Sequence, residues 1–291
     1  MSGVRKVFLN LGKGFDLLNI PYDINLPFKK IKPGDPVIML GEGRYALEGY
    51  DRPNPVIAGI GLMTHPTEWL DLFEQYPVAT YLQHSEWARD MYAGTYPKEK
   101  LGIWPAGIDT EKWSPSTQTD KNIDFLVYSK IMWNKQETAD QLRSPIIEKL
   151  QQAGFTYREI TYGSYQEAEY FDLLQQCKAM IFLCEHESQG FALGEALSMN
   201  VPVLAWDQGL WLDPNRFNWG ENSVVPASST PYFDARCGMR FKNLDEFNEK
   251  LDIFWKKANS GEFSPRDYMV ENLTLKKSAQ IMLDIINSIY E

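Results

Sequence analysis

The sequence has few cysteines, no excess of basic residues and no long apolar run. Its formal net charge of −10 and its isoelectric point near 5.0 argue against a nucleic-acid-binding surface, which needs clustered basic side chains. No stretch approaches the roughly 20 apolar residues that span a bilayer, and the N-terminus lacks the apolar core of a signal peptide. We therefore expect a cytoplasmic protein with no membrane span and no nucleic-acid partner.

The three cysteines, Cys177, Cys184 and Cys237, are odd in number and lack the spacing of metal ligands. The first two stand among apolar residues, so we interpret the cysteines as reduced core residues. Neither an Asp-x-Asp pair nor a cluster of histidine and cysteine stands out after a predicted strand. We therefore expect no metal ion and no cofactor.

Strand-like apolar segments alternate with helix-like segments along most of the chain, and a hydrophobic content of 44% supplies ample core. The predicted strands are residues 37–40, 56–60, 78–82, 123–128, 157–162 and 179–184, and the predicted helices are residues 67–75, 85–92, 138–153, 166–176 and 190–198. Another amphipathic helix is predicted at the N-terminus. The alternation predicts parallel, doubly wound sheets, whose ligands bind beyond the carboxyl ends of the strands. After residue 206 the pattern loosens, with one short strand predicted at 222–229, a helix at 243–257 and a final helix from Ser264.

Two carboxylates, Glu187 and Glu195, flank a glycine-bearing helix start in Glu-Ser-Gln-Gly-Phe-Ala-Leu-Gly-Glu. Backbone N–H groups in the first turn can face an anion such as a phosphate, and Gly190 permits its close approach. One carboxylate could then accept hydrogen bonds from a ribose and the other from a sugar. The spacing fits equally well with two solvated acids at a helix start, which the helix dipole favours.

This stretch resembles the Glu-x7-Glu element of retaining glycosyltransferases of family 4. Three further blocks resemble that family in order and spacing: residues 81–91, Trp104-Pro-Ala-Gly-Ile-Asp, and Tyr-Ser-Lys-Ile-Met-Trp-Asn-Lys ending at Lys135. The resemblance spans roughly residues 78–205. It implies an α/β fold of the GT-B type, in which two Rossmann-like doubly wound domains face a cleft.

The resemblance also implies domain bounds, with one departure from the family. A GT-B chain normally begins with a strand and a glycine-rich loop, whereas this sequence opens with a helix, so we expect a shortened first domain at residues 1–113. Residues 114–120 are polar and turn-rich and are predicted to form a linker. The nucleotide-sugar-binding domain is predicted at residues 121–263, and a helical segment at 264–291 is expected to cross back to the first domain.

Site residues follow from the same resemblance. Lys130 and Lys135 stand where the family carries a basic pair against the donor diphosphate, although the first position is more usually Arg. Two cations there would neutralise the charge that grows on the leaving diphosphate. The residues assigned to donor binding are Glu195, Gly190, Phe191, Ala192, Leu193 and Tyr165, the last near the nucleotide base. Glu187 is assigned to the transferred sugar.

Only three histidines are available for acid–base chemistry. His65 follows a predicted strand, and the resemblance implies that it faces the donor sugar, while the alternative is a loop histidine that caps Thr67. His84 precedes Ser85, a good helix N-cap, and is interpreted as structural. His186 adjoins Glu187 and could orient it.

These observations predict a metal-independent retaining glycosyltransferase that moves a sugar from a nucleotide-diphosphate sugar to a saccharide or other hydroxyl acceptor. The predicted catalytic residues are Glu187, Lys130, Lys135 and His65. The alternative is a non-catalytic sugar-nucleotide-binding module that acts as partner subunit of a complete transferase, because the first domain is expected to be short.

Overall fold

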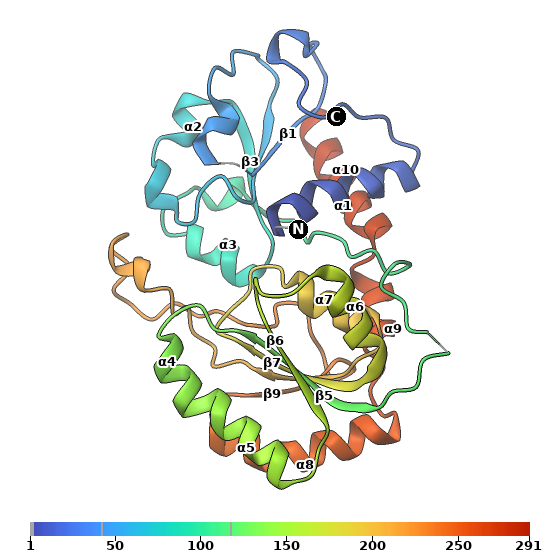
Figure 1. Cartoon of the computed structure of the whole chain (residues 1–291). Coiled ribbons are helices and arrows are strands. Elements are labelled where there is room, and N and C mark those ends of the chain that lie inside the picture. Colours follow the sequence, from blue (N-terminus) through green and yellow to red (C-terminus); the bar gives the residue numbers. More distant parts are fainter. Residues whose placement is uncertain (1–2, 42, 117) are drawn as a thin grey trace. The chain divides into compact units, whose positions relative to one another are not determined.

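A computed structural model describes residues 3–41, 43–116 and 118–291 of the chain (Figure 1), so residues 1, 2 and 42 of the predicted first domain and residue 117 of the predicted linker lie outside the described residues. The chain divides into two compact units. Unit 1 comprises Met1–Gly107, Asn218–Gly220 and Leu273–Glu291. Unit 2 comprises Ile108–Phe217 and Glu221–Asn272.

Unit 1 is built on a four-stranded parallel sheet in the order β1-β2-β3-β4. The strands are β1 (Val37–Leu40), β2 (Val56–Gly59), β3 (Val78–Gln83) and β4 (Leu101–Ile103). The α-helices are α1 (Gly3–Leu17), α2 (Leu72–Gln75), α3 (Glu86–Tyr92) and α10 (Leu275–Tyr290), and the 3₁₀ helices are Phe28–Lys30, Gly43–Leu47, Pro66–Trp69 and Lys98–Lys100. β2 is buried along its whole length, as its apolar sequence predicts.

The last helix of the chain, α10, packs on the first, α1, within unit 1 (Figure 1). A side chain at Gly14 of α1 would collide with the backbone of Leu275, so this glycine lets the two helices approach closely. The Trp104 indole N–H donates to the Ser278 carbonyl at 2.9 Å, and the Ser278 hydroxyl donates to the Pro105 carbonyl at 2.7 Å. These bonds tie α10 to the segment that follows β4.

Unit 2 is built on a five-stranded parallel sheet in the order β6-β5-β7-β8-β9. The strands are β5 (Ile123–Lys130), β6 (Tyr157–Thr161), β7 (Cys177–Cys184), β8 (Val203–Trp206) and β9 (Gly238–Phe241). The α-helices are α4 (Lys135–Thr138), α5 (Ser144–Gln152), α6 (Glu167–Gln176), α7 (Phe191–Ser198), α8 (Leu244–Ser260) and α9 (Pro265–Asn272), with a 3₁₀ helix at Pro214–Phe217. In this order the chain reverses its winding between β5 and β7, which is the switch point of a doubly wound sheet.

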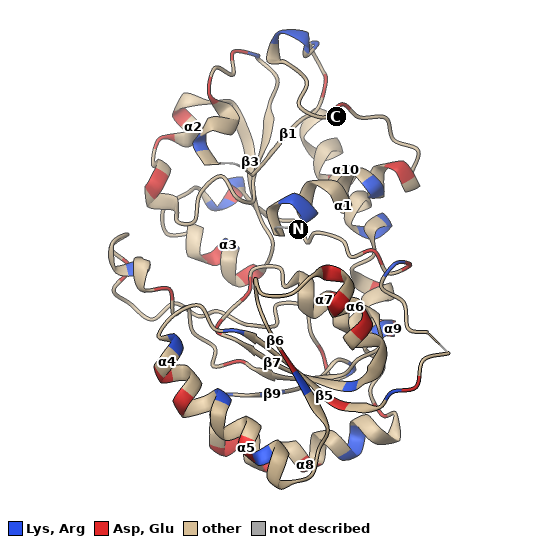
Figure 2. Cartoon of the chain, in the orientation of Figure 1, with Lys and Arg blue, Asp and Glu red and all other residues tan. Residues whose placement is uncertain are grey.

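Charged residues of both signs are interspersed along α4, α5 and α8 (Figure 2). The opposite side of α5 and α8 supplies buried apolar residues to the core that packs against the sheet, among them Ile146, Leu150 and Phe247. This division is the one expected of amphipathic helices on a sheet. Within the described residues, every helix is too short or too polar to cross a membrane.

The parallel alternation of strands and helices is confirmed, and several details differ from the sequence prediction. The helix predicted at residues 138–153 begins with a π-helical segment, Ala139–Arg143, which ends two residues before Pro145, a residue that lacks a backbone N–H. The strand predicted at residues 222–229 is wrong. Those residues contribute one bridge, from Pro226 to Leu210, with backbone hydrogen bonds at Val225 and Ala227. Ser228 and Ser229 bond instead to the Asp207 carboxylate.

The final helix predicted from Ser264 is two helices, α9 and α10. Thr274 interrupts the helix and caps α10, because its side chain accepts from the Lys277 N–H. The helix predicted at residues 67–75 is likewise two pieces, the 3₁₀ helix Pro66–Trp69 and the short α2.

Candidate functional site

The carboxyl ends of β5 and β7 bring together Lys130 and Glu187, two of the predicted catalytic residues. Lys130 is the last residue of β5 and pairs in register with Cys184, the last residue of β7. Glu187 follows three residues later, on the loop that leads into α7. Since parallel strands end at the same edge, Lys130 and Glu187 meet at the switch point of the sheet.

Lys130 and Glu187 form an ion pair, with 2.5 Å between Nζ and Oε1. Their side chains are 21% and 13% exposed, so water screens the pair only in part. Burial lowers the pKa of Lys130, but Glu187 and other neighbours outweigh burial, and the pKa of Lys130 lies above its ordinary value. The ammonium also lies 4.7 Å from the centroid of the exposed Tyr162 ring. A charged, partly accessible cation therefore stands at this edge.

Glu185, which the sequence did not single out, holds the loop between Lys130 and Lys135. Its buried carboxylate accepts the Met132 N–H at 2.9 Å and the Trp133 N–H at 3.2 Å. Burial raises the pKa of Glu185, although these two N–H groups and Lys130 oppose the shift. The signal available in the sequence was its position directly after β7.

The N-terminus of α7 has the form of an anion site. Gly190 precedes the helix in a left-handed conformation, with φ of 75°, and its side chain of one hydrogen provides no cap. The first intrahelical bond of the ladder runs from the Gly194 N–H to the Gly190 carbonyl at 2.9 Å. The N–H groups of Phe191, Ala192 and Leu193 therefore have no acceptor inside the helix and can serve an anion.

Close packing fixes the position of α7 within unit 2. A side chain at Gly194 would come within 3.0 Å of Ile108 and 3.3 Å of Met269 on α9, so this position favours glycine. At the other end of α7, Arg266 donates to the Ser198 carbonyl at 2.7 Å and to the Thr110 carbonyl at 3.0 Å. The helix is thus anchored along its length, which keeps its N-terminus in place.

Glu195 is buried in the second turn of α7. It lies near Tyr170, whose pKa is raised first by burial and then by the negative charge of Glu195. The Tyr170 hydroxyl donates to the Ala192 carbonyl at 2.7 Å. The structure therefore places the second carboxylate on the rigid part of the motif and the first, Glu187, on its loop.

Lys135 and Tyr165 are less clearly placed for their predicted roles. Lys135 is exposed at the first position of α4, and within the described residues it forms no ion pair or hydrogen bond with Glu187. The Tyr165 hydroxyl lies 3.0 Å from that of Tyr128, and its ring packs 5.4 Å from the ring of Tyr170. The base-binding role of Tyr165 stays a prediction.

His65 and His84 both have structural contacts in unit 1. The His65 ring nitrogen Nδ1 lies 2.8 Å from the Thr67 hydroxyl and caps the 3₁₀ helix, which is the alternative anticipated for this residue. The same ring stacks on Trp219 at 5.4 Å. His84 is buried with Nδ1 at 3.2 Å from the Trp104 carbonyl, and burial lowers the pKa of His84 to about 4.

His186 stacks on Trp133 at 5.0 Å, on the loop held by Glu185. Burial, and then the positive charge of Lys130, lower the pKa of His186 to about 4. Its imidazole is therefore neutral at pH 7. Where the structure describes side chains, it contains no group of three or more His, Cys, Asp or Glu arranged to hold a metal ion.

No family model and no curated protein matches the chain. Solved structures do match. They include AviGT4, a glycosyltransferase involved in avilamycin A biosynthesis, at 12% identity and a TM-score of 0.59, over 100% of this chain and 90% of that one. Anabaena HepE in complex with UDP and glucose matches at 10% identity and a TM-score of 0.59, over 99% of this chain and 96% of that one. The pneumococcal O-GlcNAc transferase GtfA in complex with UDP and GlcNAc matches at 12% identity and a TM-score of 0.58, over 98% of this chain and 60% of that one.

At these identities the likeness shows the fold. The chain has the GT-B type of α/β fold with parallel, Rossmann-like sheets, as the sequence predicted.

Proposed function

We propose that this chain is a metal-independent, retaining glycosyltransferase that moves a sugar from a nucleoside-diphosphate sugar to a hydroxyl acceptor. The observation that carries the proposal is the Lys130–Glu187 pair at the β5/β7 switch point, because Glu187 lies on the loop that leads into the N-terminus of α7. Support comes from HepE and GtfA, which share the fold and whose structures contain UDP with glucose or GlcNAc.

The diphosphate is assigned to the N-terminus of α7 and to Lys130. The N–H groups of Phe191, Ala192 and Leu193 can each donate to a phosphate oxygen, and the helix dipole adds partial positive charge. When the bond between sugar and phosphate breaks, the electron pair leaves with the diphosphate, and Lys130 can neutralise the growing charge. We assign Lys135 to the same task, as a second cation from the start of α4.

The two carboxylates are assigned different parts of the donor. Glu195, rigidly held in α7, is assigned to the ribose hydroxyls, and Glu187 to the transferred sugar. Glu187 pairs with Lys130 in the structure, so a diphosphate that binds Lys130 would compete with this carboxylate for the same ammonium. His65 is assigned to orientation of the sugar and Tyr165 to the base, both because of the resemblance in sequence.

The proposal is tested with the purified chain alone. A panel of nucleoside diphosphates is first screened by thermal shift, since a ligand that binds only the folded state raises the melting temperature. The corresponding sugar donors are then incubated with the chain and hydroxyl acceptors, and release of nucleoside diphosphate is measured. We expect one base to bind and its donor to be consumed. Tight binding without consumption of donor over a broad acceptor panel would instead identify a non-catalytic partner subunit.

A further inference from the structure

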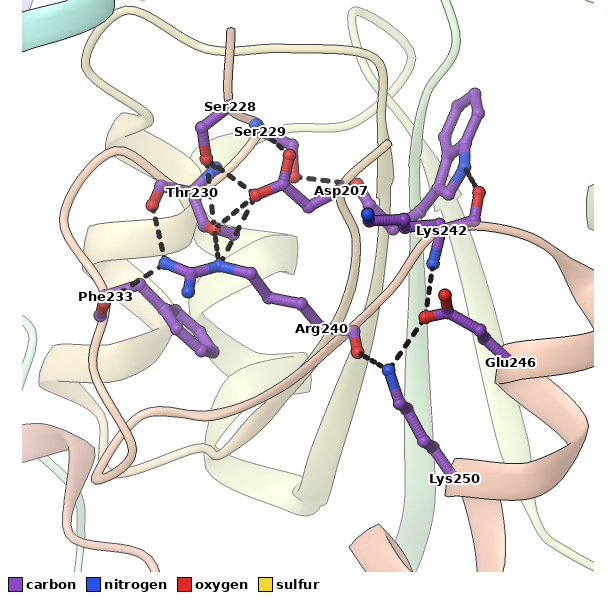
Figure 3. Close-up of polar contacts among 10 residues, drawn as sticks. Asp207, Ser228, Ser229, Thr230, Phe233, Arg240, Lys242, Glu246 and Lys250 are labelled. Carbon is purple, nitrogen blue, oxygen red and sulfur yellow. Dashed lines mark hydrogen bonds and ion pairs between the residues drawn. The ribbon is translucent and has the colours of Figure 1, made fainter. Parts of the chain in front are cut away.

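A polar cluster in unit 2, made of Asp207, Ser228, Ser229, Thr230 and Arg240, belongs to none of the assigned motifs (Figure 3). Asp207 directly follows β8, and its side chain is only 9% exposed. Its carboxylate accepts the Ser228 hydroxyl at 2.7 Å, the Ser229 N–H at 3.1 Å and the Thr230 hydroxyl at 3.3 Å. A largely buried carboxylate thus bonds to three consecutive residues that follow the Leu210–Pro226 bridge and lie outside any strand.

Arg240 on β9 supports the same segment from the other side (Figure 3). Its Nε donates to the Thr230 hydroxyl at 2.6 Å and lies 3.4 Å from the Asp207 carboxylate. Its Nη2 donates to the carbonyls of Thr230 and Phe233 at 3.2 and 3.1 Å. The charge of Asp207 is therefore balanced within the cluster, and its oxygens are largely occupied by bonds that fix the backbone.

A backbone hydrogen bond connects this cluster to the candidate site. The Glu187 N–H donates to the Ser228 carbonyl at 2.8 Å. Ser228 is therefore bonded to Asp207 through its hydroxyl and to Glu187 through its main chain. The Glu187 side chain is held separately, by Lys130. A donor diphosphate at Lys130 would draw the ammonium away, and the backbone tether would then remain to keep Glu187 in place.

We propose that Asp207, acting through Ser228, is a positioning residue that fixes Glu187 for the transferred sugar. The inference rests on the proposed function, because Glu187 needs accurate placement only if it contacts a reacting sugar. A misplaced contact of about 1 Å is enough to slow an enzymatic step, while binding through other residues is retained. The tether should therefore affect turnover and leave nucleotide affinity alone.

The test compares Ser228→Ala, which removes the hydroxyl bonded to Asp207, with Ser223→Ala, whose exposed hydroxyl bonds to Glu221 at 2.6 Å. In Ser228→Ala we expect kcat at saturating donor to fall about tenfold, the scale of one lost hydrogen bond to a charged group, with unchanged nucleoside diphosphate affinity. Ser228→Thr, which keeps a hydroxyl, should restore kcat. Adding Ser228→Ala to Glu187→Gln should cause no further loss, because the tether acts only through that carboxylate.

A second measurement does not depend on activity. Amide hydrogen exchange of the peptide that contains Glu187 should be about tenfold faster in Ser228→Ala than in wild type and unchanged in Ser223→Ala. If exchange and kcat are both unchanged in Ser228→Ala, the inference is wrong. A loss of kcat that is multiplicative with Glu187→Gln would also overturn it, since it would indicate a general structural effect. If the wild-type chain transfers no sugar, the proposed function fails, and the exchange result alone decides whether the tether exists.

Discussion

Removing the charges of Lys130 and Glu187 one at a time and together should reveal strong coupling between them. The perturbations are Lys130→Met and Glu187→Gln, which keep much of the side-chain volume. Each single change leaves one group partly buried beside a neutral partner. The double change leaves no unpaired charge, so it should lower the free energy of unfolding by clearly less than the sum of the two single changes.

The magnitude follows from the geometry of the pair. Opposite charges about 4 Å apart attract by about 4 kcal/mol at an effective dielectric constant near 20. The side chains here are 21% and 13% exposed, so solvent screens part of that attraction. We expect a coupling free energy of about 2 kcal/mol, between the values for exposed and fully buried pairs. The same contact keeps Lys130 charged, so Glu187→Gln should also lower the pKa of Lys130.

The assay is urea unfolding of all four proteins at pH 7 and low salt. Lys112 and Glu167 provide the control, because this ion pair is 47% and 33% exposed and lies in the same unit. Its coupling should be below about 1 kcal/mol. If the effects of Lys130→Met and Glu187→Gln on the free energy of unfolding add within about 0.5 kcal/mol, the reasoning is refuted. The two side chains would then not interact, and a diphosphate at Lys130 would not compete with Glu187.

Three further outcomes are expected. Glu195→Ala should weaken nucleoside diphosphate binding by about 1.5–3 kcal/mol in calorimetry, the scale of a hydrogen bond to a charged group, whereas Glu187→Gln should leave it nearly intact; equal losses would contradict the division of roles. His65→Ala should lower turnover with unchanged diphosphate affinity, and His84→Ala should lower the melting temperature, so the reverse pattern would move the sugar-orienting role to His84. Acidification should destabilise the fold, because the pKa values of His84 and His186 are both lowered to about 4, and the unfolded chain takes up protons near pH 6.5 that the folded chain does not. For His84 the loss between pH 7 and pH 5 should be roughly 2 kcal/mol, and unfolding curves of His84→Asn should lack that part of the pH dependence.

Six of the nine strands in the described part of the chain could be predicted from the sequence, because apolar runs are a local pattern, whereas β4, β8 and β9 were not predicted. The family resemblance assigned Lys130 and Glu187 to the donor, but their ion pair was not predicted. Apolar runs bounded by turns mark the strands, and the parallel order then brings the strand ends together. Glu185 and Asp207 could not be assigned in the same way. Glu185 bonds to Met132, 53 residues away, and Asp207 bonds to Ser228, 21 residues away.

Strand propensity gave a wrong prediction at residues 222–229, where backbone pairing is limited to one bridge. Residues 222–229 have a strand-like composition, yet Asp207 and Arg240 hold the end of this stretch and the residues after it through side-chain hydrogen bonds. For His65, by contrast, the local sequence did indicate the observed contact. Its capping of Thr67 was a recognisable local alternative, and the structure contains that contact.

The central claim is that Glu187 contacts a sugar that this chain transfers. The most direct measurement is the release of nucleoside diphosphate from the preferred donor, at saturating concentration with acceptor, by wild type and Glu187→Gln side by side. We predict release by the wild-type chain and a rate at least about tenfold lower in the variant, because a charged contact made in the transition state is lost. Equal rates in the two proteins, or no release by wild type despite tight nucleotide binding, would contradict the account.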